Sequence, residues 1–329
     1  MKNILITGGA GFIGSHLVKH FVRKYPDYKI INIDALTYAG NLENISEIES
    51  FSNYIFEQVD IRDINKLNTI FRKYYITDVI HLAAESHVDN SIENPLEFIE
   101  TNINGTANLV HVAYKFWKDN LSAHRFYHVS TDEVFGALDF DSPLFTEETK
   151  YDPHSPYSAS KASSDFIVKS FHDTFEMNTI ISHCSNNYGT HQYPEKLIPV
   201  VINKLIQRQN IPVYGNGKNV RDWLLVTDHV NAIDILFHEG NSGETYNIGG
   251  NNEVSNIDLV KLLCRIYDDI TGENNSELLI TYVTDRKGHD LRYGIDSSKL
   301  QNNFNWKPTG NFIEELTKVV KWYIEQWKE

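Results

Sequence analysis

The glycines in ILITGGAGFIGSHL, residues 4–17, restrict the fold more than any other feature of this 329-residue sequence. They form the spacings Gly9-x-Gly11-x-x-Gly14 and Gly8-x-x-Gly11-x-x-Gly14, directly after an apolar run and at the start of a helical pattern. Glycine permits a tight turn there and a close approach of the backbone to a pyrophosphate, which the helix N-terminus attracts. The stretch therefore predicts a dinucleotide site, and a glycine turn without a ligand is the alternative.

The second apolar run ends on an acidic residue that favours the dinucleotide interpretation. Asp34 closes YKIINID, where a carboxylate can accept hydrogen bonds from ribose hydroxyls. The same charge would repel a 2′-phosphate, so we expect NAD rather than NADP. Because strand ends line the crevice of such a sheet, Asp60 would also lie there and could bond the adenine amino group. The residues expected to contact NAD on this basis are Gly8, Gly11, Phe12, Ile13, Gly14, Asp34, Asp60, Ile61, Leu82, Ala83 and Ala84. Thr101, on the helical stretch after Pro95, is a further candidate, and an ordinary helix threonine is the alternative.

The order of patterns along the chain predicts the architecture. In the first half, β-branched runs such as NILIT, YIFEQVD and RFYHVST alternate with amphipathic helical stretches, which is typical of βα units around a parallel sheet. The later segments are rich in Gly, Pro, Asn and charge, as binding loops are. We predict an α/β fold in which residues 1–185 form a doubly wound parallel (Rossmann) sheet for NAD, with later strands contributed by the second half. Residues 186–329 would mainly form a smaller, interwoven C-terminal α/β lobe for the substrate.

Composition and charge exclude several classes of partner. A formal net charge of −14 would repel nucleic acid and anionic membranes, so an anionic ligand needs a local basic pocket. No apolar stretch approaches the roughly 20 residues of a membrane span. Cys184 and Cys264 lack a metal-type spacing. We expect a cytoplasmic protein that binds neither nucleic acid nor membranes and holds no metal.

Two polar patterns in the middle of the chain predict catalysis. YSASK places Tyr157 and Lys161 four residues apart on one helical face, where the ammonium would favour the phenolate. VSTDEVFG places Asp132 and Glu133 side by side after a buried strand. These carboxylates either cap a loop or helix or divide acid and base work between them. Neighbours on a strand point to opposite faces, so catalysis requires the strand to end by about Thr131.

Together these features resemble the extended short-chain dehydrogenase/reductase family of nucleotide-sugar enzymes, over nearly the whole chain. Five stretches resemble its 4,6-dehydratases rather than its epimerases: HLAAESHVDNS, STDEVFG, NNYGTHQYPEKLIP, VRDWLLVTDH and DRKGHDLRYGID. The resemblance implies a hydro-lyase with tightly held NAD that acts on dTDP-glucose, in deoxysugar (rhamnose-type) biosynthesis. It also implies a homodimer, with residues 106–117 and 163–175 as the contacting helices.

The resemblance further implies a role for each catalytic residue. Tyr157, paired with Lys161, would deprotonate the 4-hydroxyl while the C4 hydride passes to NAD, and Thr131 would hydrogen-bond the 4-oxygen. Glu133 would remove the C5 proton and Asp132 would protonate the departing 6-hydroxyl, before hydride returns to C6 of a 4-keto-6-deoxy sugar. The remaining cofactor contacts that it implies are Tyr157, Lys161 and, near the nicotinamide, Asn187. The substrate contacts that it implies are Ser86, Thr131, Asn186, Lys196, Arg221, Asn256, Asp285, Arg286 and His289.

Two alternatives stay open from the sequence. The chain could be another nucleotide-sugar enzyme of the same fold, either a 4-epimerase or a UDP-sugar dehydratase. It could also be a non-catalytic NAD-binding protein, for which a broken Tyr/Lys pair would be expected, whereas Tyr157 and Lys161 are both present.

Overall fold

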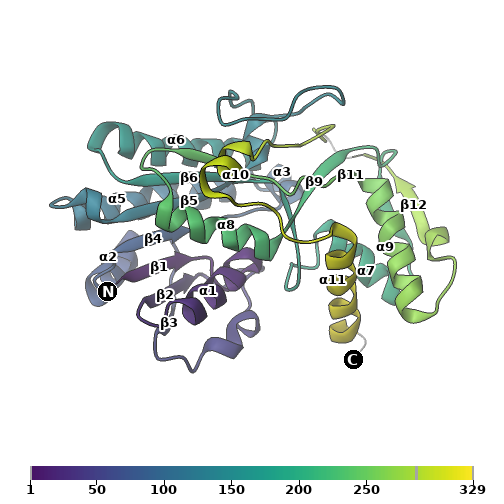
Figure 1. Ribbon diagram of the computed structural model, residues 1–329, viewed down its shortest axis with the longest axis horizontal. Coiled ribbons are helices and arrows are strands. Elements are labelled where there is room, and N and C mark those ends of the chain that lie inside the picture. The colour runs from purple at the N-terminus through teal and green to yellow at the C-terminus, as the bar shows by residue number, and fades with distance from the viewer. Residues whose placement is uncertain (1, 286–287, 328–329) are drawn as a thin grey trace.

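A seven-stranded sheet organises the computed structural model, which describes residues 2–285 and 288–327 (Figure 1). The strand order is β10-β6-β5-β4-β1-β2-β3, and all neighbouring strands run parallel. The order reverses between β1 and β4, which is where doubly wound sheets open a crevice for a ligand. The predicted Rossmann fold is confirmed. Its strands are β1 (Asn3–Thr7), β2 (Lys29–Asp34), β3 (Tyr54–Gln58), β4 (Asp78–His81), β5 (Arg125–Thr131), β6 (Thr179–Cys184) and β10 (Thr245–Ile248).

Helices cover both faces of this sheet because its strands are apolar on both sides. In β1, Ile4 and Ile6 belong to the core that contains Leu17 of α1, whereas Leu5 between them belongs to the core that contains Leu109 of α5. Side chains of α1 and α8 fill the first core, and those of α2, α5 and α6 fill the second. These helices are α1 (Phe12–Lys24), α2 (Ile64–Tyr74), α5 (Thr106–Trp117), α6 (Pro156–Phe175) and α8 (Val226–Glu239).

The second half of the chain builds a smaller lobe around a core of its own. A three-stranded sheet, β11-β9-β7, and a two-stranded sheet, β12-β8, accompany three helices there (Figure 1). The chain also returns to the large sheet, because β10 is its edge strand and Leu300 packs in the first core. The lobes are interwoven, and the boundary at residue 185 stays a prediction. The elements are β7 (Asn186–Tyr188), α7 (Leu197–Ile206), β8 (Ile211–Tyr214), β9 (Val220–Leu225), β11 (Glu253–Ser255), α9 (Asn256–Thr271), β12 (Ile280–Val283), α10 (Ser298–Phe304) and α11 (Phe312–Trp327).

Short helical segments complete the crossovers of the sheet. They include a π-helix, η2, directly before α5. No helix in the described part of the chain combines the length and the apolar character needed to cross a membrane. The short segments are η1 (Leu42–Ile48), α3 (Val88–Glu93), α4 (Pro95–Phe98), η2 (Ile99–Gly105), η3 (Leu121–Ala123), η4 (Asp132–Phe135) and η5 (Ser276–Leu279).

A buried carboxylate ties α1, the first helix of the sheet, to α8, which comes from the second half of the chain. Asp234 of α8 accepts hydrogen bonds from Lys24 Nζ at 2.6 Å and Tyr25 OH at 2.8 Å. His20 Nε2 lies 2.7 Å from Asp234 Oδ2, and His238 Nδ1 lies 2.9 Å from Oδ1. Burial alone would raise the pKa of Asp234, but these hydrogen bonds outweigh it and lower the pKa well below its usual range.

We expect Asp234→Asn to lower the free energy of unfolding by about 3 kcal/mol near neutral pH, because it removes a buried, paired charge. The stabilisation is complete above the unfolded-state pKa of about 3.9 and is lost as the pH falls through the lower folded-state pKa. Urea denaturation should therefore show the gap between Asp234→Asn and the wild type closing below about pH 4. Asp269→Asn, at an exposed carboxylate of α9, should show no such pH-dependent gap.

Candidate active site

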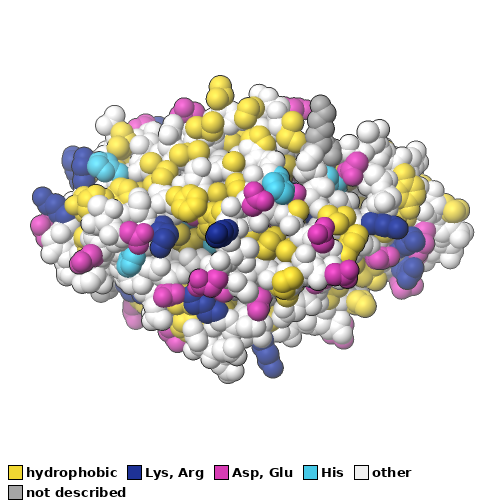
Figure 2. Space-filling model, turned by 90° about the horizontal axis from the view of Figure 1, so that it is seen from above, with side chains coloured by type: hydrophobic (Ala, Val, Ile, Leu, Met, Phe, Trp, Pro, Cys, Tyr) yellow, Lys and Arg dark blue, Asp and Glu magenta, His cyan; other side chains and the backbone are white. Residues whose placement is uncertain are grey.

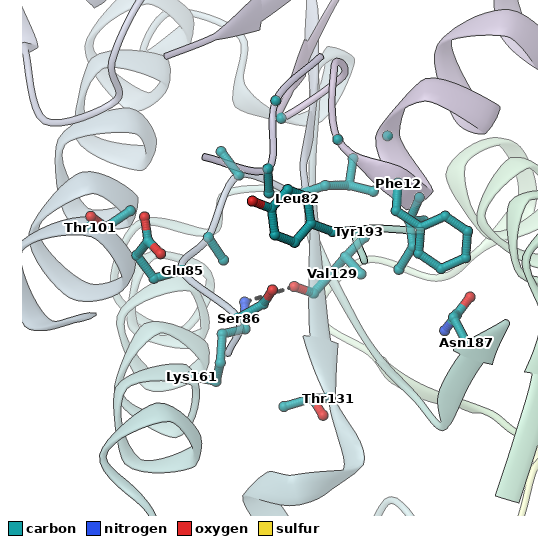
Figure 3. Close-up of a pocket in the computed structure, with 18 of the residues that line it drawn as sticks. Phe12, Leu82, Glu85, Ser86, Thr101, Val129, Thr131, Lys161, Asn187 and Tyr193 are labelled. Atoms are coloured by element: carbon teal, nitrogen blue, oxygen red, sulfur yellow. Dashed lines mark hydrogen bonds between the residues drawn. The ribbon is translucent and has the colours of Figure 1, made fainter. Parts of the chain in front are cut away.

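A cavity of about 360 Å³ lies at the carboxyl ends of the parallel strands and extends to loops of the second lobe (Figure 3). It gathers residues that are far apart in the sequence, from the glycine turn through the start of α6 to residues 184–197. All residues predicted to be catalytic or to contact the cofactor line it. Of the predicted substrate contacts, those that line it are Ser86, Thr131, Asn186 and Lys196.

The glycine turn forms one wall of the cavity and requires its glycines. Gly8 has φ +73°, and a Cβ there would stand 2.8 Å from Ala83 N. A Cβ on Gly14 would stand only 2.1 Å from the carbonyl oxygen of Gly8. The backbone therefore folds tightly on itself under the N-terminus of α1, which leaves room for a close-lying anion.

Asp34 stands at the end of β2 beside this turn. Its Oδ2 accepts a hydrogen bond from Ala10 N at 3.0 Å, and its Oδ1 accepts one from Leu36 N at 2.8 Å. Burial raises its pKa, while these two backbone bonds act in the opposite direction. Each carboxylate oxygen has a second acceptor position, so Asp34 can still accept hydrogen bonds from a ligand in the cavity.

Asp60 has a partner that the sequence interpretation missed. Arg62 donates from Nε and Nη2 to Asp60 Oδ2, at 2.9 and 2.7 Å, and from Nη1 to Glu97 Oε1 at 2.6 Å. Although burial acts to raise the pKa of Asp60, the hydrogen bonds from Arg62 lower it overall. Arg62 lines the cavity, and its position two residues after an aspartate that was predicted to lie at a strand end is a signal that could have revealed it. The contact of Asp60 with adenine stays a prediction.

The strand before Asp132 and Glu133, the acid pair, ends by Thr131, as the catalytic interpretation of these carboxylates requires. β5 ends at Thr131, and the 3-10 helix η4 begins at Asp132, with the Thr131 hydroxyl accepting a hydrogen bond from Glu133 N at 3.3 Å. The turn of a helix replaces the alternation of a strand, so Asp132 and Glu133 both line the same cavity. The two carboxylates also lie in the first turn of a helix, so they can favour the helix N-terminus and still be available for acid–base chemistry.

Burial is the main influence on the pKa of Asp132. Its side chain is 2% exposed, and among the described residues Oδ2 has no hydrogen-bond partner. Burial first, and then the charge of Glu133, raise the pKa of Asp132 well above its usual range, while Arg221 acts against this. A carboxyl group that keeps its proton at neutral pH can act as an acid toward a group in the cavity.

Tyr157 and Lys161 stand on one face of α6 beside this pair. Ser155 caps the helix through a capping box, which fixes its first turn. Lys161 Nζ donates to the carbonyl oxygen of Val129 at 2.9 Å (Figure 3). Burial lowers the pKa of Lys161. Burial and then Glu133 raise the pKa of Tyr157 well above 10, so the phenolate needs more positive charge than a simple Tyr/Lys pair suggests.

The other predicted substrate residues that the structure describes lie outside the lining of the cavity. Arg221 donates to the carbonyl oxygen of Asp290 at 3.0 Å, and its guanidinium lies 4.2 Å from the centre of the Tyr293 ring. Asn256 Oδ1 is buried and has no hydrogen-bond partner among the described residues. Asp285 Oδ1 lies 2.7 Å from His289 Nδ1. Arg286 falls outside the described residues.

Two contacts connect the cavity with the second lobe. Lys196 Nζ donates to the carbonyl oxygen of Ser86 at 2.8 Å, which joins the loop before α7 to the loop after β4. His229 Nδ1 lies 2.9 Å from Asn187 Oδ1 and so fixes the amide of Asn187. The sequence interpretation also missed lining residues next to the predicted ones, whose only signal is this proximity: Glu85, Cys184, Ser185, Gln192, Tyr193, Glu195 and Trp223.

The fold and this cavity define an extended short-chain dehydrogenase/reductase, a class built on a dinucleotide-binding sheet with a tyrosine and a lysine one helical turn apart. The model of the family described as GDP-mannose 4,6 dehydratase matches residues 5–319. The chain belongs to this family of nucleotide-sugar dehydratases, and the predicted family membership is confirmed.

Similar proteins carry a more specific name. A dTDP-glucose 4,6-dehydratase of Escherichia coli is 50% identical, over 98% of this chain and 94% of its own length. The structure of a dTDP-glucose 4,6-dehydratase from Bacillus anthracis in complex with NAD has a TM-score of 0.89 and 42% identity, over 100% of this chain and 99% of that one. One from Streptomyces venezuelae, with NAD and TYD bound, has a TM-score of 0.90 and 40% identity, over 98% and 97% of the two chains.

We expect Gly14→Ala to weaken NAD binding by at least about tenfold, since the loss of a single well-placed hydrogen bond amounts to about that much. The added Cβ would meet the Gly8 carbonyl oxygen and force the turn open. Calorimetric titration with NAD measures the affinity, and a melting curve taken without NAD checks the fold. A variant that keeps the wild-type melting temperature and the wild-type affinity would contradict the role of this turn.

Proposed function

We propose that this protein is an NAD-dependent hydro-lyase that converts dTDP-glucose to dTDP-4-keto-6-deoxyglucose and water. The observation that carries the proposal is the acid pair, because Asp132 and Glu133 line one cavity with Tyr157 and Lys161. The names of the similar proteins support the choice of substrate and reaction. The pathway would be deoxysugar biosynthesis of the rhamnose type.

The residues of the glycine turn fit NAD. The space beside Gly8 and Gly14 is one that a Cβ would fill, and Asp34 keeps acceptor positions for ribose hydroxyls. Asn187, with its amide fixed by His229, would hold the nicotinamide end. When bound, NAD supplies a hydride acceptor for C4 and a hydride donor for C6, so that it is regenerated in each turnover.

Oxidation at C4 would begin with a proton transfer to Tyr157. The Tyr157 phenolate would take the proton of the 4-hydroxyl, and the Thr131 hydroxyl would hydrogen-bond the same oxygen. Because burial and Glu133 both oppose the phenolate, Lys161 must keep its positive charge for Tyr157 to act as a base near neutral pH. A ketone at C4 then acidifies the neighbouring C5 proton.

The acid pair would carry out the elimination. Glu133 would take the C5 proton while Asp132, whose pKa burial raises, would give its proton to the 6-hydroxyl that leaves as water. The C5–H and C6–O bonds break and a C5–C6 double bond forms. Return of hydride to C6 and of a proton from Glu133 to C5 would complete the product.

The nucleotide of the substrate would lie toward the second lobe. Lys196 offers a positive charge at the cavity, and Arg221 offers a planar donor group near Asp132. Asn186 Oδ1 and Asn256 Oδ1 are buried acceptors without a partner among the described residues, which a bound ligand could satisfy. Asp285 and His289 would border the same region.

We also propose a homodimer in the cytoplasm. Figure 2 shows hydrophobic side chains gathered on the part of the upper face over the side where α5 and α6 lie in Figure 1. Phe116 of α5 and Phe166 and Phe175 of α6 are 37%, 59% and 39% exposed, which is unusual for phenylalanine and suits a helix–helix interface. Two buried free thiols, Cys184 and Cys264, suit a reducing compartment.

An isotope experiment distinguishes this function from its alternatives. dTDP-glucose and UDP-glucose deuterated at C4 are incubated with the protein, and mass spectrometry follows water loss and the position of the label. We expect loss of water from dTDP-glucose and deuterium at C6. Deuterium that stays at C4 without dehydration would overturn the proposal, and inversion at C4 would identify a 4-epimerase. Faster turnover of UDP-glucose would identify a UDP-sugar dehydratase.

The proposed roles of Asp132 and Glu133 predict that elimination, rather than C4 oxidation, fails when either residue is changed. Asp132→Asn and Glu133→Gln should slow elimination by about 10² to 10⁴-fold while slowing C4 oxidation by less than about tenfold. Rapid mixing separates the steps, since absorbance reports reduced cofactor and quenched samples report the dehydrated sugar. Asp141→Asn, at an exposed carboxylate of the following loop, should leave both rates unchanged. Equal slowing of both steps would argue against this division of work.

A further inference from the structure

A third charged residue continues the catalytic face of α6 into the protein interior. Tyr157, Lys161 and Asp165 follow one another at four-residue intervals, so their side chains project from one side of the helix. The first two line the cavity, whereas Asp165 lies beneath it and is 1% exposed. A carboxylate so far from water must have a compensating environment.

Asp165 holds together three separate segments. Its Oδ2 accepts hydrogen bonds from Ser130 Oγ of β5 at 2.8 Å and from Tyr151 OH, in the segment before α6, at 3.1 Å. His183 Nε2 of β6 lies 3.0 Å from the same oxygen, and His128 Nε2 of β5 lies 3.2 Å from Oδ1. Burial acts to raise the pKa of Asp165, but the contacts with His128 and His183 lower it well below its usual range, so the group is an anion at neutral pH.

Of the two groups that raise the pKa of Lys161, Asp165 is the one that carries a charge near pH 7. Burial lowers the pKa of Lys161, and the groups that raise it are Asp165 and Cys184. Burial also raises the pKa of the Cys184 thiol to about 12, so that it is neutral near pH 7. Burial first, and then the charge of Lys161, lower the pKa of His128 to about 4, so that it too is neutral.

We propose that Asp165 is a positioning residue of the reaction, which keeps Lys161 charged and fastens the end of β5 to α6. Ser130 directly precedes Thr131, so its hydrogen bond to Asp165 links the helix of the Tyr/Lys pair to the segment of the acid pair. Asp165 acts through Lys161 and Ser130 and does not touch the substrate. This inference rests on the proposed function and extends it.

The pH dependence of turnover tests the charge. Deprotonation of Lys161 ends the support of the Tyr157 phenolate, so activity falls as the pH rises through the pKa of Lys161. Asp165→Asn keeps the shape of the side chain and removes its charge, which lowers that pKa. We expect the alkaline limb of the kcat profile for dTDP-glucose to move down by about one pH unit, with NAD affinity unchanged within about twofold.

Asp173→Asn is the matched control, because Asp173 also lies on α6 and forms an exposed pair with Lys169 at 3.6 Å. It should leave the alkaline limb in place. If Asp165 had a structural role alone, Asp165→Asn would lower kcat by the same factor at every pH and leave the alkaline limb in place. That result would overturn the proposal.

A double-mutant cycle of stability tests the coupling of Asp165 to Lys161 without turnover. It also applies where Asp165→Asn folds poorly or where the proposed function fails. Lys161→Met, Asp165→Asn and the double variant are compared by thermal unfolding. One unpaired buried charge is worse than none, so the double variant should melt higher than Asp165→Asn alone. Additive losses, or a double variant that does not fold, would contradict the coupling of Asp165 to Lys161.

Discussion

The end of β5 at Thr131 is the constraint on which the rest of the site depends. One more residue of extended chain would have turned Asp132 and Glu133 to opposite faces of the sheet, and only one of them would have lined the cavity. The change to a 3-10 helix at Asp132 brings both to one place. Ser130 and Thr131 fasten this change, the first to Asp165 of α6 and the second to the backbone of Glu133.

Burial then gives these groups their different chemistry. It raises the pKa of Asp132 well above its usual range, it lowers the pKa of Lys161, and together with Glu133 it raises the pKa of Tyr157. A site of this kind works only where each charge has a fixed partner, because water does not screen the interactions. The buried anion Asp165, with hydrogen bonds from β5 and from the segment before α6, is the partner that we propose for Lys161.

The two lobes supply different parts of the site for a topological reason. Parallel strands end at one edge, so the glycine turn, Asp34 and the acid pair meet there although they are distant in sequence. The second lobe adds the side chains that face them, and the contact of Lys196 with the Ser86 carbonyl joins the two. The return of β10 to the large sheet holds the lobes together.

The sequence by itself determined the Rossmann fold, the glycine turn and the family, because alternating apolar runs and fixed spacings are local signals. It also identified Asp132, Glu133, Tyr157 and Lys161 as candidates. It missed the pairing of Arg62 with Asp60 and the contacts of Asp165, and it predicted that the Tyr157 phenolate forms more easily than burial allows. These features depend on which side chains meet across strands and on how much water is excluded from them. Only the tertiary structure decided them, because the local spacing of residues does not determine burial or the distance between side chains.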